Sequence, residues 1–135
     1  MPYLLAYISG IVIMIVLDAV FLTQVALPHY ERDVPHLLAE DPDYLAAAVF
    51  YAMYVAGVVW FVLRPALAAQ AGWPGVLGQG ALLGLFAYAT FEITAKAVLV
   101  GWTWSLVVTD VLWGGVVTAA VTAAGYAVLR RTASA

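Results

Sequence analysis

Residues 84–115 read GLFAYATFEITAKAVLVGWTWSLVVTDVLWGG, and this stretch decides how the chain folds. It joins two long apolar runs through a turn at residues 101–104. About 20 predominantly apolar residues are enough to cross the hydrocarbon of a bilayer as a helix. Three ionisable residues interrupt the runs: Glu92, Lys96 and Asp110. A charged side chain at the bilayer centre costs at least about 2.5–3.5 kcal/mol, so the stretch predicts transmembrane helices that carry a polar site.

The composition of the whole chain places it in the membrane class. Of its 135 residues, 66% are hydrophobic and 10% are charged. Soluble domains average about 45–50% apolar and about 25% charged residues. The chain has no cysteine, which excludes disulfides and thiolate metal ligands, and its net charge of −3 argues against nucleic acid as a partner. Because no metal motif or cofactor loop is present, we expect no metal and no cofactor.

Four apolar runs, at residues 3–27, 44–63, 75–100 and 105–129, predict four membrane spans in a single transmembrane domain. Their short connections predict an all-α, up-down-up-down four-helix bundle. The acidic segment 28–43 is expected to be a solvated loop, with a helix N-cap at Asp41 or Asp43. Pro65 is expected to end the second span, because proline cannot continue the helical hydrogen bonds.

Basic residues near the helix ends predict the orientation of the bundle. With four spans, Arg64, Arg130 and Arg131 share one side, and only Arg32 lies on the other. Basic residues favour the cytoplasmic side. We therefore expect a multi-pass membrane protein with both termini in the cytoplasm and the acidic loop outside.

Depth in the bilayer singles out one group of ionisable residues. Counted at about 1.5 Å per helical residue, four of them fall in the outer half of the bilayer: Asp18, Glu92, Lys96 and Asp110. The helices alternate in direction, so this common depth does not follow from sequence position. Aromatic and hydroxyl residues are the expected pocket walls: Tyr51, Tyr54 and Thr94 in the same layer, and Tyr88 and Trp113 somewhat deeper.

Spacing along the third span predicts two contacts. Lys96 follows Glu92 by four residues, the favourable order for an ion pair on one helix face. That pair leaves Asp18 and Asp110 with no partner of opposite charge. Gly80 and Gly84 form a small-xxx-small pair, which predicts a close helix contact within the bundle or across a dimer.

Three functions are compatible with these residues. The first is binding or transport of a small or lipid-like molecule, with Asp18, Glu92 and Asp110 as proton-linked or cation-binding groups. Transport through so small a chain would require a homodimer. The second is an enzyme that acts on a lipid or isoprenoid substrate by carboxylate acid–base chemistry. The third is a structural accessory subunit in which the acids only fix helix packing. We favour binding or transport.

Several motifs carry a family resemblance. YATFEIT at residues 88–94 and VTDVLWG at residues 108–114 resemble small bacterial predicted membrane proteins catalogued as a domain of unknown function. LDAVFL at residues 17–22 is similar to the opening motif of that family. The resemblance covers essentially the whole chain and implies a four-span inner-membrane protein without an established activity. The family's third-span motif is Tyr-Asp-x-Thr-Asn, whereas this chain has Phe91, Glu92, Thr94 and Ala95 at those places, which makes it a variant.

The predicted orientation can be tested directly, because a chain without cysteine gives no labelling background. Single cysteines at positions Asp33 and Ser134 are treated with a membrane-impermeant maleimide in intact cells. We expect labelling at position 33 and none at position 134. Labelling of position 134 would reverse the orientation, and labelling of both positions would indicate dual insertion.

Overall fold

The computed structural model describes residues 1–134, and this part of the chain contains helices and no strand. Four long helices, each long and apolar enough to cross a membrane, span Pro2–Asp33, Tyr44–Ala68, Trp73–Val98 and Trp104–Ser134. They comprise α1 (Pro2–Phe21), η1 (Leu22–Ala26), α2 (Leu27–Asp33), α3 (Tyr44–Val58), η3 (Val59–Leu63), α4 (Arg64–Ala68), α5 (Trp73–Val98) and α6 (Trp104–Ser134). A short 3₁₀ turn, η2, covers Pro35–Leu37. The predicted all-α, four-helix class is confirmed.

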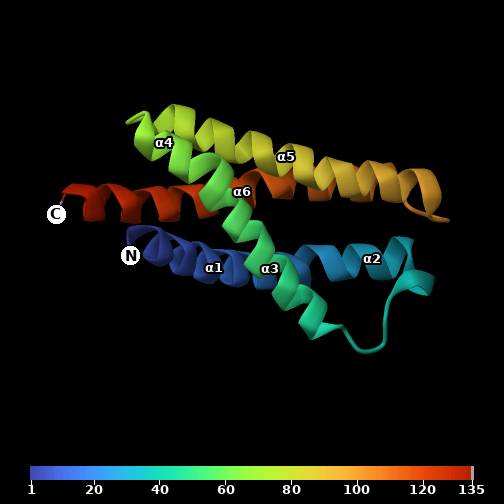
Figure 1. Ribbon diagram of the computed structural model, residues 1–135. Helices are drawn as coiled ribbons and strands as arrows, with labels where there is room; N and C mark the ends of the chain where they lie inside the picture. The colour runs from blue at the N-terminus through green and yellow to red at the C-terminus, as the bar shows by residue number, and fades with distance from the viewer. Residues whose placement is uncertain (135) are drawn as a thin grey trace.

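The helix α6 is the centre of the arrangement. It packs along both α1 and α5, and it contributes more buried residues than any other helix. Consecutive long helices run in alternating directions, and both ends of the chain lie at the same end of the molecule (Figure 1). The α3–α4 helix crosses the others obliquely. Which end of the bundle faces the cytoplasm stays a prediction.

The outward faces of the helices are apolar. Large hydrophobic side chains are exposed along every long helix, among them Val16, Phe61, Phe86, Leu112 and Val116. Water would solvate such a continuous apolar surface poorly, whereas lipid tails solvate it well. Together with the four spans, this surface defines a multi-pass membrane protein.

Two π-helical turns let the chain pass through prolines that were expected to interrupt it. Leu27 donates its amide to the carbonyl of Leu22, and Arg64 donates to Val59, each five residues back. Pro28 or Pro65 follows immediately, and the helix continues to Asp33 or Ala68. The expectation that Pro65 ends its helix was therefore wrong. A wider π turn skips a backbone carbonyl, so the missing proline amide removes no bond that the helix needs.

The segment expected to be a solvated loop is exposed over most of its length, but part of it is helical and it is anchored to the bundle at Val34. Residues 27–33 are helical, and residues 35–37 form a 3₁₀ turn. Val34 between them is 1% exposed and packs in an apolar cluster with Ala95, Trp102, Leu106 and Val107. Burial of these apolar side chains stabilises the attachment of the segment to the bundle. The many acidic residues around Val34 gave no indication of this contact in the sequence. The N-cap prediction is confirmed for Asp43, which accepts a hydrogen bond from the amide of Ala46 at 3.0 Å.

Glycines set the close approach of α5 to α6. A Cβ atom added to Gly84 would collide with the backbone of Gly114 and the side chain of Thr118, and one added to Gly80 would collide with Thr122. The predicted close contact at Gly80 and Gly84 is thus confirmed, and it lies within the bundle. Close backbone approach of this kind is how helices pack without a hydrophobic drive between them.

The glycine seam predicts opposite effects for two alanine substitutions on one helix. Gly84→Ala should lower the stability by about 1–3 kcal/mol, because the added methyl group overpacks the contact with Gly114. Gly78→Ala is the matched control, since its Cβ atom meets nothing within 4 Å. It should stabilise by up to about 1 kcal/mol through the higher helix propensity of alanine. Thermal unfolding in detergent measures both, and equal midpoints for the two variants would contradict the seam.

Candidate functional site

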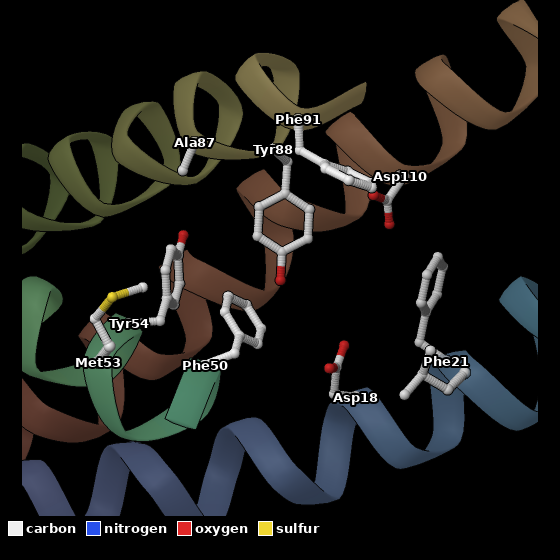
Figure 2. Close-up of a pocket in the computed structure, with 10 residues that line it drawn as sticks. Asp18, Phe21, Phe50, Met53, Tyr54, Ala87, Tyr88, Phe91 and Asp110 are labelled. Carbon is white, nitrogen blue, oxygen red and sulfur yellow. The ribbon is translucent and has the colours of Figure 1, made fainter. Parts of the chain in front are cut away.

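A cavity of about 530 Å³ lies between the α3 helix and the rest of the bundle. It forms where α3 crosses obliquely away from α5 (Figure 1). Figure 2 shows its walls, which come from all four long helices. The cavity is lined by Asp18, Phe21, Leu22, Phe50, Met53, Tyr54, Ala87, Tyr88, Phe91 and Asp110. Two carboxylic acids in a mainly aromatic and aliphatic lining are the pattern of a ligand pocket with a few orienting polar groups.

Asp18 is held in place by two donors from neighbouring helices. Its carboxyl group is 7% exposed on α1. Oδ2 accepts a hydrogen bond from the Tyr51 hydroxyl at 2.6 Å, and Oδ1 accepts one from the Trp113 indole at 3.0 Å. Trp113 in turn stacks on Phe21 with ring centroids 4.5 Å apart. Both oxygens thus accept from donors, as a carboxylate requires, and the side chain has a fixed orientation at the cavity.

Asp110 reaches the same cavity from α6. Figure 2 shows the carboxyl groups of Asp110 and Asp18 entering the space from opposite sides, with Phe21 and Tyr88 beside them. Asp110 is close enough to both Glu92 and Asp18 to interact with them electrostatically. It also lines a second, water-sized cavity of about 10 Å³ together with His29 and Tyr30. The half-buried Asp110 therefore lies between the large cavity and the α2 residues His29 and Tyr30.

Glu92 lies behind Asp110 and does not line the large cavity. Its side chain is completely buried on α5. Oε2 accepts a hydrogen bond from the Trp102 indole at 2.8 Å, whereas Oε1 has no hydrogen-bond partner among the described residues. A buried polar atom without a partner is costly. The structure brings the three acids of the predicted layer together. Asp18, Glu92 and Asp110 all lie within electrostatic range of one side chain, the phenol of Tyr30.

The predicted ion pair between Glu92 and Lys96 is wrong. In residues 1–134 the ion pairs are His29–Asp33 and Arg32–Asp33, and neither involves Lys96. The Lys96 ammonium instead lies 5.6 Å from the centroid of the exposed Trp104 ring. An ion pair one turn apart on a helix contributes only about 0.2–0.5 kcal/mol, which does not offset burying the ammonium. A lysine near a helix end reaches the interface instead, where a tryptophan face attracts it.

The expected wall residues divide into three groups. Tyr54 and Tyr88 line the cavity directly, and the Tyr54 hydroxyl is hydrogen-bonded to Thr118 at 2.6 Å. Tyr51 and Trp113 act through their hydrogen bonds to Asp18. Thr94 is exposed on α5 and does not line the cavity, so that expectation was wrong. A helical position two residues from Glu92 points to a different face of the helix.

The apolar half of the cavity was missed by sequence reasoning. Its members are Phe21, Leu22, Phe50, Met53, Ala87 and Phe91. Nothing in a uniformly apolar span separates a residue that lines a cavity from one that faces lipid. The one available signal was position along the helix, because Phe21 and Phe91 stand within one turn of Asp18 and Glu92.

A second polar cluster lies between α2 and the start of α6. His29 Nε2 lies 3.2 Å from Asp33 Oδ2 and 3.0 Å from Ser105 Oγ. Thr103 also donates to Asp33, and Arg32 donates to its other oxygen. A catalytic triad needs the acid and the serine on different ring nitrogens. Here both contact the same nitrogen, so the cluster ties α2 to α6 and does not activate the serine.

The described residues also bear on metals. Within residues 1–134, no group of three or more His, Asp or Glu side chains is placed to hold a metal ion. The large cavity therefore offers carboxylate oxygens, tyrosine hydroxyls and aromatic faces as its chemistry. These groups can bind an amphiphilic molecule, accept a cation or hold a proton.

The fold and the site define a small multi-pass membrane protein with a group of acids at one cavity. A family model described as "Predicted membrane protein (DUF2177)" matches residues 3–127, so the chain belongs to this family. The resemblance drawn from the motifs is confirmed. No curated protein and no solved structure matches the chain.

The bond between Trp102 and Glu92 predicts a coupled pair of variants. Trp102→Phe removes the indole donor of the buried carboxyl and should destabilise the protein by about 1–3 kcal/mol beyond the loss of packing. In a Glu92→Met background the same substitution should cost distinctly less, because only packing is then lost. Thermal unfolding in detergent measures the difference. An equal cost in both backgrounds would show that the hydrogen bond contributes nothing.

Lys96→Leu is the matched control, because Lys96 lies on α5 one turn beyond Glu92. Without an ion pair to Glu92, the loss of this half-buried ammonium should change the stability by no more than about 0.5 kcal/mol. A large loss that Glu92→Gln restores would reinstate the pairing.

Proposed function

We propose that the protein binds a lipid-like amphiphilic molecule in the large cavity. The observation that carries this proposal is a 530 Å³ space with two carboxylic acids, Asp18 and Asp110, in an otherwise apolar and aromatic lining. A pocket of about 300–1,000 Å³ with a few polar groups is the usual form of a small-molecule site. Of the interpretations open from the sequence, binding or transport is the one this space favours.

The rim of the cavity supports an amphiphile over a water-soluble ligand. Met53 on α3 is 66% exposed, and Phe91 on α5 is 57% exposed, although both line the cavity. Both belong to the apolar surface that we assign to lipid. A molecule can therefore enter sideways from the bilayer, with its apolar part along this rim and its polar group at Asp18 and Asp110.

The setting of this proposal is the bacterial inner membrane, with the cavity in the outer leaflet. The orientation rests on the distribution of basic residues, and the depth rests on the position of the acids along their helices. Binding needs one copy of the chain. Transport would need a second copy to enclose a path, since four helices are too few to do so alone.

Native mass spectrometry of protein extracted in a mild detergent tests the proposal. We expect the wild-type protein to retain a bound amphiphile as a defined mass increment. Ala87→Trp should remove most of this increment, because the indole fills the cavity from its α5 wall. Leu82→Trp is the control, since Leu82 is on the same helix, is 47% exposed and lies outside the cavity lining.

Two outcomes would contradict ligand binding. One is a wild-type protein without any bound molecule and without thermal stabilisation by added lipids. The other is an increment that Ala87→Trp leaves intact, which would locate the bound lipid on the outer surface. Either result would return the acids to a structural role in helix packing.

A further inference from the structure

We propose that the polar group which the cavity selects is an organic cation, namely an ammonium headgroup on an apolar chain. This inference rests on the proposed function and specifies its ligand. The ammonium would lie between the Asp18 and Asp110 carboxyl groups, against the aromatic faces beside them. Three features of the described residues support a cation over a neutral or anionic headgroup.

The first feature is charge. Asp18 and Asp110 line the cavity, and no lysine, arginine or histidine lines it. Lys96, the one lysine in the sequence, lies over the Trp104 ring, and Arg32 is bound to Asp33. An anionic headgroup would find no partner here and would be repelled. A cation would supply the counter-charge that the protein itself does not place in the cavity.

The second feature is the unsatisfied acid behind the cavity wall. Glu92 is completely buried, Oε1 has no partner among the described residues, and the side chain is close to Asp110. Neighbouring carboxyls repel one another when both are ionised. A cation at Asp110 relieves that repulsion without direct contact with Glu92, so the third acid adds to the attraction. A neutral headgroup would relieve nothing.

The third feature is the aromatic lining. Five aromatic rings line the cavity that holds the two acids: Phe21, Phe50, Tyr54, Tyr88 and Phe91. Figure 2 shows Phe21 and Tyr88 beside the two carboxyl groups. Aromatic faces attract ammonium groups, and several rings around one site are how proteins recognise quaternary ammonium. Hydroxyl donors for a neutral headgroup are few. The lining offers two phenols, and that of Tyr54 is already bonded to Thr118.

A matched pair of probes tests the charge of the headgroup alone. Dodecyltrimethylammonium is compared with dodecyldimethylamine N-oxide at pH 8, a near-isostere that keeps the chain and a polar headgroup but carries no net charge. Binding to the full-length protein in maltoside micelles is followed by native mass spectrometry and by tryptophan fluorescence, to which Trp113 at Asp18 should respond. We expect the wild-type protein to prefer the ammonium at least tenfold.

Variants assign that preference to the site. Asp110→Asn should reduce the preference several-fold and leave binding of the N-oxide unchanged. Phe50→Leu, which keeps an apolar wall but removes a ring, should also reduce it and serves if the first variant does not fold. Asp41→Asn is the control, because this acid is exposed in the outer loop and away from the cavity. A preference that survives Asp110→Asn and Phe50→Leu unchanged would overturn the assignment.

The outcomes separate this inference from the proposed function. If the wild-type protein binds both probes equally, and Ala87→Trp abolishes both, the cavity binds amphiphiles but does not select a cation. That result would mean that shared protons neutralise the acids. If the wild-type protein binds neither probe and carries no lipid, the inference and the proposed function fail together.

Discussion

Three helices of the bundle depend on one buried carboxyl group. Asp18 on α1 accepts hydrogen bonds from Tyr51 on α3 and from Trp113 on α6, so a single side chain links three helices. Water is absent from the hydrocarbon region, and a polar group there has to find its partners inside the protein. The link matters most for α3, whose first residues are exposed as it diverges from the others. The cavity exists because the carboxyl group anchors α3 at one point and leaves an opening beside it.

The seam between α5 and α6 positions the other two acids. Glycines at positions 84 and 114 bring the backbones together, so that Glu92 and Asp110 lie near one another above the contact. Trp102, in the turn between the helices, closes over Glu92 and excludes solvent from it. The glycines thus allow α5 and α6 to approach closely, and Glu92 is buried near this contact. The Trp102 indole donates the hydrogen bond that the buried carboxyl of Glu92 accepts.

Hydropathy was sufficient to predict the class of fold, and depth along the helices singled out three acids that the structure places near one another. Four apolar runs gave the helices, and counting along them placed Asp18, Glu92 and Asp110 in one layer. Two kinds of information were missing. The position of the Lys96 ammonium depends on whether a weak ion pair with Glu92 or the contact with Trp104 is the more stable. The four-residue spacing alone favours Glu92, which is the wrong partner. The apolar lining depended on the crossing angle of α3, which no single-residue property encodes.

The π turn at residues 22–26 also adjusts the rotational phase of the first helix. The buried residues Ala6, Gly10, Met14 and Asp18 repeat every four positions, and such a stripe rotates by about 40° at each step of an α-helix. Left alone, it would turn away from α6 before the outer end. The extra residue of a π turn takes back about 100°. By this count Ala26 and Tyr30 return to the face that carries Asp18, and the next turn still reaches α6, where His29 lies 3.0 Å from Ser105.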